Sequence, residues 1–378
     1  MKKLWILIFC LSIFLGFQID RTEYWTPPER MTWNSGNSLD PLLLAEGIKV
    51  HVFWYDNTPG NNEIFYKRST NATYTWETPK RLTYTTGESQ NHSVCHDADN
   101  LYIVWEDNTS GNYELYFKSS SDAGVNWSPP KRLTYNTQNS KRPVIINDST
   151  GNLHLVWHQP DILNGEIYYK KSTNSGSTWT SPTRLTWNAG SSWLPAIAVS
   201  QSGTLHVVWE DDASGNKEIY HKKSIDKGST WTNPLRLTWT SGETISPAVT
   251  VDGSGMVLVF WSDNSSGNYE IFLKRSIDSG STWMAPQRMT WTSGETVIQK
   301  NGAYSGGTST YITWMDSTSG CFEIYYTRTI DSGVNWQPRT RMTWNSRMSM
   351  EPSIYSFYII WYEFFSDTNS EIVNKHQT

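Results

Sequence analysis

Hydrophobic and polar residues alternate in short segments along the chain, and seven further segments are apolar runs that end in a tryptophan. The alternation predicts β-strands, and no segment after the first 18 residues shows the period of an amphipathic helix. The seven tryptophans follow one another at intervals of 51, 52, 52, 52, 53 and 47 residues. They are Trp54, Trp105, Trp157, Trp209, Trp261, Trp314 and Trp361. A period of this length predicts a repeat architecture.

One repeat unit contains four strand-like segments separated by turn-forming residues. In the fifth unit these segments are residues 247–251, 256–261, 269–276 and 287–291, and Gly, Asp, Asn and Ser fill the turns between them. Four antiparallel strands in a radially repeated unit are typical of a β-propeller blade. We therefore expect an all-β propeller.

The number of blades follows from a second recurring segment, R-[LM]-T-[WY], which marks the outer strand. It also occurs seven times, beginning at Arg30, Arg81, Arg132, Arg184, Arg236, Arg288 and Arg341. The first copy precedes any complete unit, whereas the last unit ends after its third strand. We therefore predict seven blades in a single domain, residues 19–378, in which residues 19–34 complete the C-terminal blade and close the ring. Alignment of the units places the start of the mature chain near residues 18–20.

The first residues predict export. Lys2 and Lys3 precede an apolar run over residues 4–17, as in a signal peptide, and an uncleaved signal anchor is the alternative for residues 1–18. We therefore expect a secreted or cell-surface protein that meets a membrane only through this leader, if the leader is not cleaved. The net charge of −5 and the absence of a basic run argue against nucleic acid as a partner. Cys95 and Cys321 occupy different repeat positions, so we expect no disulfide framework.

The turn between the third and outer strands reads S-x-D-x-G-x-x-W. Clear copies begin at Ser120, Ser224, Ser276 and Thr329, and a copy beginning at Ser172 carries Asn174 in place of Asp. This motif resembles the Asp box, or BNR repeat, of the sialidase superfamily. The resemblance implies a structural turn, in which the Asp carboxylate accepts backbone N–H groups, Gly takes a positive φ and Trp packs between sheets.

Most of the 21 tryptophans are explained by the repeat. One set ends the second strands, a second set closes the Asp-box-like turns, and a third set lies on the outer strands; we expect all three to fill the space between blades. Only Trp5, in the leader, and Trp193 fall outside this scheme. The Arg of the outer strand and a Glu of the third strand recur in every unit, so we interpret them as structural.

Candidate site residues are those that break the repeat on the face of the ring opposite the Asp-box-like turns. Trp193 is a candidate for stacking on a sugar, and the other candidates for ligand binding are Asp40, Arg142, His158, Arg347 and Glu351. Glu106 and Glu210 follow second-strand tryptophans and are weak candidates for a catalytic carboxylate pair. Each also has a structural interpretation, as a rim carboxylate, a loop histidine or a residue lining a wet channel.

These residues support two principal hypotheses. The first is a non-catalytic, exported module, a monomer that binds a glycan or a cell-surface protein. The alternative is a sialidase-like, exo-acting glycoside hydrolase with an atypical site at the channel mouth. The sialidase resemblance implies a Tyr nucleophile and three arginines that grip a carboxylate, but this chain has no Arg-Ile-Pro motif and few arginines outside the repeat. A role in assembly is a third hypothesis. We expect no cofactor and no metal ion.

Overall fold

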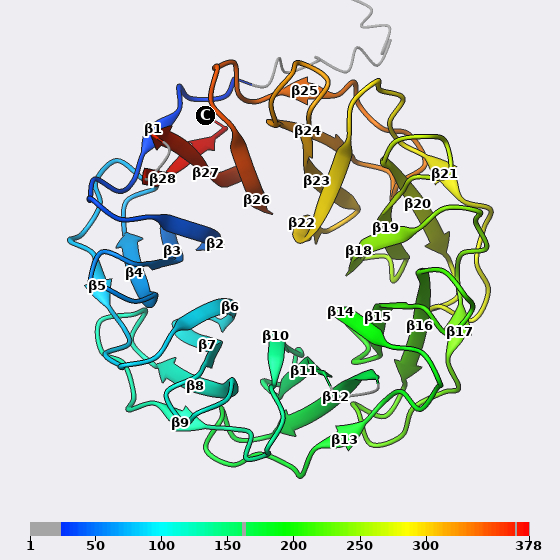
Figure 1. Cartoon of the computed structure of the whole chain (residues 1–378), viewed down its shortest axis with the longest axis horizontal. Helices are drawn as coiled ribbons and strands as arrows, with labels where there is room; N and C mark the ends of the chain where they lie inside the picture. Colours follow the sequence, from blue (N-terminus) through cyan, green and yellow to red (C-terminus); the bar gives the residue numbers. More distant parts are fainter. Residues whose placement is uncertain (1–23, 161–163, 367–368, 378) are drawn as a thin grey trace, which may run out of the picture.

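The chain forms a ring of seven four-stranded antiparallel sheets around a central axis (Figure 1). This computed structural model describes residues 24–160, 164–366 and 369–377. The predicted seven-bladed β-propeller is therefore confirmed. Among the described residues there is no helix that could cross a bilayer. The predicted leader, residues 1–18, and the predicted start of the mature chain lie outside the described residues.

Each blade takes its strands in chain order from the axis outward, except at the seam. Blade 1 contains β2 (Ser38–Glu46), β3 (Lys49–Asp56), β4 (Glu63–Ser69) and β5 (Lys80–Arg81). Blade 2 contains β6 (Ser89–Asp97), β7 (Asn100–Asp107), β8 (Glu114–Ser120) and β9 (Lys131–Arg132). Blade 3 contains β10 (Lys141–Asn147), β11 (Leu153–Pro160), β12 (Gly165–Ser172) and β13 (Thr183–Arg184). Blade 4 contains β14 (Ser192–Val199), β15 (Leu205–Asp211), β16 (Glu218–Ser224) and β17 (Leu235–Arg236).

The remaining blades follow the same plan. Blade 5 contains β18 (Thr244–Val251), β19 (Val257–Asp263), β20 (Glu270–Ser276) and β21 (Gln287–Arg288). Blade 6 contains β22 (Thr296–Gly306), β23 (Ser309–Asp316), β24 (Glu323–Thr329) and β25 (Thr340–Arg341). Blade 7 contains β26 (Ser349–Tyr355), β27 (Tyr358–Ser366), β28 (Asn369–His376) and the N-terminal β1 (Glu29–Arg30). The outer strands are only two residues long, shorter than the sequence predicts.

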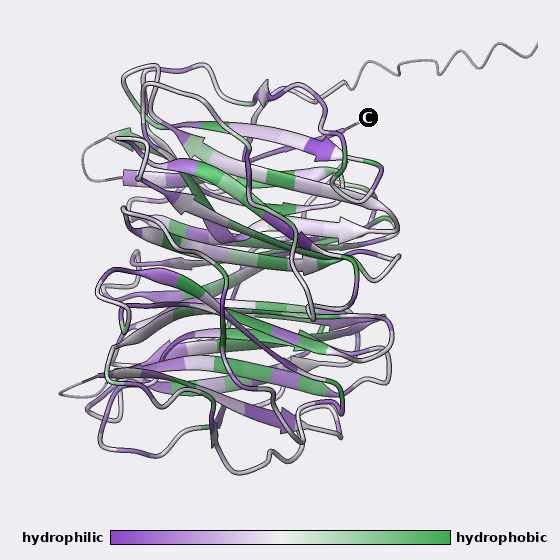
Figure 2. Ribbon diagram, turned by 90° about the vertical axis from the view of Figure 1, so that its right-hand side faces the viewer, coloured by the Kyte–Doolittle hydropathy of each residue, from purple (hydrophilic) through white to green (hydrophobic). Residues whose placement is uncertain are grey.

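The core lies between adjacent sheets, and Figure 2 shows hydrophobic residues concentrated in the strands. Second strands such as β19 are buried along their whole length, because a neighbouring sheet covers each face. This explains why the second-strand segments read as nearly continuous apolar runs.

The N-terminal strand closes the ring as predicted. Glu29 and Arg30 pair with Asn374 and Val373 of β28, and Trp25 forms an isolated bridge with Gln377. The Arg30 side chain donates to the buried Glu371 carboxylate at 2.5 Å. The last blade is therefore built from both ends of the chain.

The recurring Arg and Glu form one ion pair within every blade. The outer-strand guanidinium donates to a third-strand carboxylate that is almost completely buried, and its Nε donates to a nearby threonine carbonyl, as Arg236 does to Glu218 and Thr238. The pairs are Arg30–Glu371, Arg81–Glu63, Arg132–Glu114, Arg184–Glu166, Arg236–Glu218, Arg288–Glu270 and Arg341–Glu323. Their structural interpretation agrees with these contacts.

The S-x-D-x-G-x-x-W segments form tight hairpin turns. Asp122 accepts the Ser120 hydroxyl at 2.8 Å and the Asn126 backbone N–H at 2.8 Å, and Gly124 adopts a φ of 82°. These hydrogen bonds lower the pKa of Asp122 to about 2. The carboxylate is therefore occupied by its own turn.

The three tryptophan sets differ in exposure. The expectation that all three fill the space between blades is wrong for the outer-strand set. Second-strand tryptophans are at most 2% exposed, and the tryptophans that close the turns are half-buried. Outer-strand Trp33, Trp187, Trp239, Trp291 and Trp344 are instead 64–67% exposed. They do not fill the space between blades, because the outer strand is the free edge of each sheet. Cys95 and Cys321 are both free.

Candidate functional site at the channel mouth

A repeated backbone bulge shapes one mouth of the central channel. Each first strand contains a bulge, and in six blades the residue at this bulge has a φ between 45° and 55°, which is unusual for residues other than glycine. These residues are Asp40, Asn91, Arg142, Leu194, Ser246 and Glu351. The bulge therefore gives the mouth one non-repeating side chain from each of these blades.

The residue after the second-strand tryptophan supports the bulge of the next blade. Glu210 Oε1 accepts the Ser246 backbone N–H at 2.6 Å, and Ser262 Oγ accepts that of Ile298 at 3.1 Å. This position thus has a structural role even where it carries a carboxylate.

Glu106 and Glu210 are both buried, but their partners differ. The Asn91 side-chain amide donates to Glu106, and burial raises the pKa of Glu106 to about 7 although Lys141 and Arg142 favour its charged form. Burial also raises the pKa of Glu210, whose Oε2 lies 3.7 Å from Lys217 Nζ. At neutral pH, Glu106 therefore exists partly as the protonated acid.

Five of the eight predicted site residues line one depression of about 420 Å³. We name this depression the Trp193 groove. Its lining includes Glu106, Arg142, His158, Trp193 and Glu210, together with Gln90, Asn91, Lys141, Leu194 and Lys217. The groove thus combines one aromatic ring that lies outside the repeat with carboxylates and cations.

Within the groove, half-buried Trp193 lies in register with Glu210 of the adjacent strand. Lys217 Nζ lies 5.5 Å from the centre of the Trp193 ring. His158 is buried, and its pKa falls to about 4 because of burial and the nearby charges of Arg142 and Lys141. His158 is therefore a neutral imidazole at physiological pH.

A second depression, of about 140 Å³, lies at the axis and contains Asp40, Tyr55, Arg142, Lys300 and Glu351. We name it the axial pocket. Burial and the Asp40 carboxylate raise the pKa of Glu351 to about 7, against the opposing effect of Arg142 and Lys300. Burial also raises the pKa of the Tyr55 hydroxyl. Arg142 lines both depressions, so the two lie next to each other, and we treat them together as one candidate site.

Sequence reasoning missed Lys300. In β22 four residues separate the paired positions Ile298 and Ala303, whereas two residues separate Ile245 and Ala248 in β18. Lys300 lies in this longer bulge, and burial lowers the pKa of its ammonium group. The signal was present, because the sixth repeat lacks the first-strand proline that Pro247 supplies in the fifth.

His92 was missed in a similar way. It occupies the position of the first-strand proline in blade 2 and is fully buried. Its Nδ1 lies 3.9 Å from Asp40 Oδ2, and burial lowers its pKa to about 4. It therefore lies behind Asp40, one of the residues that line the axial pocket.

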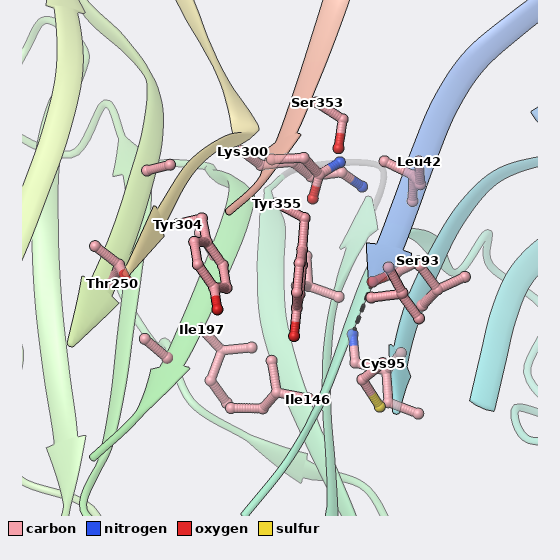
Figure 3. Close-up of a pocket in the computed structure, with 18 of the residues that line it drawn as sticks. Leu42, Ser93, Cys95, Ile146, Ile197, Thr250, Lys300, Tyr304, Ser353 and Tyr355 are labelled. Atoms are coloured by element: carbon pink, nitrogen blue, oxygen red, sulfur yellow. Dashed lines mark hydrogen bonds between the residues drawn. The ribbon is translucent and has the colours of Figure 1, made fainter. Parts of the chain in front are cut away.

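The channel continues beyond the axial pocket as a cavity of about 480 Å³ lined mainly by first-strand residues. Figure 3 shows Lys300 near Ser353 and Leu42, with Tyr304 and Tyr355 further along the cavity. The rings of Tyr304 and Tyr355 lie 4.3 Å apart. Lys300 lines both the axial pocket and this cavity, so it lies where the two meet.

Arg347 is not brought into either depression. Its exposed side chain lies over Phe365, with the guanidinium carbon 4.4 Å from the ring centre. Asp40 and Glu351 belong to the axial pocket rather than to the Trp193 groove. Across residues 24–160, 164–366 and 369–377 no three His, Cys, Asp or Glu side chains form a group suited to a metal ion.

No family model matches this chain, and no curated protein is similar to it in sequence. Polysaccharide lyase Uly1 is similar in structure, with a TM-score of 0.61, 10% identity and 90% coverage of both chains. A protein of unknown function from Dyadobacter fermentans has a TM-score of 0.55 at 14% identity, over 78% of this chain and 96% of its own. A Trypanosoma rangeli sialidase has a TM-score of 0.52 at 13% identity, over 90% of this chain and 55% of its own. At such identities the likeness shows the fold, which is a sialidase-like β-propeller.

Proposed function

We propose that this protein is an exported, non-catalytic propeller that binds an acidic glycan in the Trp193 groove. The observation that carries the proposal is the clustering of Trp193 with Lys141, Arg142 and Lys217 in one depression at the channel mouth. An aromatic ring with a few convergent polar groups is the usual composition of a small-ligand site.

The charges in the groove favour an anionic ligand. Glu106 and Glu210 are buried and engaged by Asn91 and Ser246 respectively, and Glu106 is partly neutral at pH 7. Of the cations in the groove, Lys141 and Lys217 are half-buried and Arg142 is exposed. The groove therefore offers positive charge to a ligand although the whole chain carries a net charge of −5. A guanidinium such as that of Arg142 can grip a carboxylate or sulfate with two hydrogen bonds.

Loss of the Trp193 ring tests this proposal. We expect the purified protein to bind acidic oligosaccharides in preference to neutral ones on a glycan panel, and Trp193→Ala to weaken that binding at least tenfold, since an aromatic anchor commonly contributes more than about 1.4 kcal/mol. Isothermal titration measures the change. Trp239→Ala is the matched control, because it removes an exposed tryptophan from the outer edge. Equal weakening by both variants, or none by either, would contradict the proposed site.

A second candidate function is hydrolysis of a glycosidic bond. It is favoured by Glu106, a carboxyl with a pKa of about 7 that lies in the same groove as Glu210. A carboxylic acid that holds its proton near neutral pH is suited to protonate a leaving group, and a second carboxylate can act as nucleophile or base. Turnover of chromogenic glycosides, lost at least 100-fold in Glu106→Gln, would establish this function over the binding proposal.

The proposal also covers the export of the protein and the identity of its S-x-D-x-G-x-x-W turns. We infer that residues 1–18 direct export and that the S-x-D-x-G-x-x-W turns are Asp boxes, supported by the hydrogen bonds of Asp122 and its equivalents Asp226, Asp278 and Asp331. N-terminal sequencing of exported protein tests the first inference. We expect a mature start near residues 18–20, whereas a start beyond Trp25 would contradict closure of the ring by the N-terminal strand, because Trp25 pairs with Gln377 in the last blade.

A further inference from the structure

Lysines of the third strands connect adjacent blades. Each lysine Nζ donates to an outer-strand carbonyl of the preceding blade, at 2.5–3.0 Å. The six pairs are Lys67–Met31, Lys118–Leu82, Lys170–Leu133, Lys222–Leu185, Lys274–Leu237 and Lys375–Met342. Burial lowers the pKa of each of these ammonium groups.

Exposed outer-strand tryptophans lie over four of these six ammonium groups. Lys222 Nζ is 5.2 Å from the ring centre of Trp187, and Lys274 Nζ is 5.3 Å from that of Trp239. A cation within about 6 Å of an aromatic face is attracted by the ring quadrupole. The carbonyl and the ring together form an ammonium site that the chain fills with its own lysine.

Blade 6 carries Thr327 where the other blades carry lysine. The Thr327 hydroxyl donates to the Gln337 carbonyl at 2.7 Å, within its own blade. A cavity of about 320 Å³ lies between blades 5 and 6 at this point. Its lining includes Met289, Trp291, Thr327 and Trp336. Met289 and Trp291 are the equivalents of Leu237 and Trp239, which bind Lys274 one blade earlier.

We propose that the cavity between blades 5 and 6 is a binding site for a primary alkylammonium group supplied by another molecule. In the other six blades the same position binds an ammonium group, because the lysine Nζ donates to the outer-strand carbonyl. The ligand takes its place, with its ammonium on the Met289 carbonyl and beside the ring of Trp291. A free polyamine and a lysine side chain of a partner protein both carry this group.

The cavity is accessible from the outer edge of the ring. Trp291 is 67% exposed, and Arg339 also lines the cavity. Arg339 is a cation that opposes the ligand, but its Nη1 lies 3.8 Å from Asp316 Oδ2 and its guanidinium carbon lies 5.7 Å from the Tyr325 ring centre. Asp316 therefore offsets part of its charge. Every equivalent position in the other six repeats is a proline, so Arg339 also distinguishes this crevice.

Titration of the purified exported protein with n-butylamine at pH 7 tests the site. We expect butylamine to bind at least tenfold more tightly than 1-butanol, its uncharged isostere, and to shift the indole N–H resonances of Trp291 and Trp336. Thr327→Lys is expected to abolish this binding because the new side chain fills the site as Lys274 does. Thr327→Met fills the same space without a charge and must also abolish butylamine binding. If one of the two variants fails to fold, the other still tests the site. Arg339→Gln should tighten binding severalfold.

A matched variant and two further ligands complete the experiment. Lys274→Thr opens the equivalent cavity one blade earlier, and butylamine should restore part of the thermal stability that this variant loses. Cadaverine and Nα-acetyl-lysine methylamide distinguish a free polyamine from a protein lysine. Equal binding of butanol and butylamine, binding of a neutral saccharide in place of the amine, or binding unaffected by both Thr327 variants would each overturn the proposal.

Discussion

Acidification from pH 7 to pH 4 is expected to unfold the protein cooperatively. Burial lowers the pKa of five histidines from 6.5 to about 4. They are His51, His92, His154, His158 and His206. Each is held neutral in the fold, whereas in the unfolded chain it binds a proton below about pH 6.5. The stability that these groups contribute is therefore present above pH 6.5 and is lost as the pH falls toward 4.

Two carboxyls oppose this effect. The pKa values of Glu106 and Glu351 are raised from 4.5 to about 7. As the pH falls, these two carboxyls therefore bind a proton in the folded state before they do so in the unfolded chain, and acidification from pH 7 to pH 4.5 stabilises the fold through them. Counted over these seven groups alone, five histidines against two carboxyls leave the unfolded chain with about three more protons, or roughly 4 kcal/mol per pH unit in this range. The accumulated loss is roughly 10 kcal/mol by pH 4, which is comparable with the whole stability of a typical domain.

The midpoint of acid unfolding, followed by near-ultraviolet circular dichroism, measures this prediction, and we expect it between pH 4 and pH 5. The chain provides its own control in the stacked pair His206 and His221, whose rings are 5.4 Å apart and which correspond to Leu258 and Leu273 in blade 5. The double variant His206→Leu/His221→Leu should move the midpoint at least half a unit lower. A wild-type protein that keeps its tertiary signal at pH 4, or an unchanged midpoint in the double variant, would refute this account.

The repeat predicted the fold because each strand and turn of a propeller is a local pattern copied at a constant interval. Trp261, the residues around it and their six equivalents were sufficient to predict seven blades. The outer-strand segment at Arg30, which precedes any complete unit, and a last unit that ends after its third strand together predicted that the N-terminal segment completes the last blade. Exposure was harder to predict. Trp239 and Trp261 both end predicted strands, but only Trp261 has a sheet on both sides, and the period does not report which strand lies at an edge.

The sequence predicted on which face of the ring the candidate residues lie, but not which of them line the same depression. Position within the repeat placed Arg142, Trp193 and Glu351 at one mouth, because every blade presents the same loop there. Whether two of these residues line the same depression depends on where the seven blades place their side chains around the ring. Arg347 lies on the expected loop, but its side chain packs over Phe365, apart from the others. Lys300 was missed because it lies in a lengthened bulge, and a position without a counterpart in the other units is invisible to an alignment of repeats.

Removal of residues 1–33 is expected to abolish folding, whereas removal of residues 1–23 is not. The longer deletion removes the partner of β28 and leaves Glu371 buried without Arg30, and an unpaired buried charge costs about 3–5 kcal/mol. It also removes Met31, which is 1% exposed, and a buried methionine contributes about 2–5 kcal/mol. Together these losses approach the stability of an average domain before the unpaired edge of β28 is counted.

Thermal unfolding of the two truncated proteins, followed by circular dichroism, measures the difference. The shorter deletion is the matched control, because it keeps Trp25 and every contact of β1 (Glu29–Arg30). A synthetic peptide spanning residues 24–36, added to the longer deletion, should restore a cooperative transition in a concentration-dependent manner, since it supplies the missing strand in trans. If the longer deletion melts as cooperatively as the control without the peptide, the ring does not depend on closure by the N-terminal strand. Because a repeat contacts only its neighbours, the seam would then be no more important than any other interface between blades.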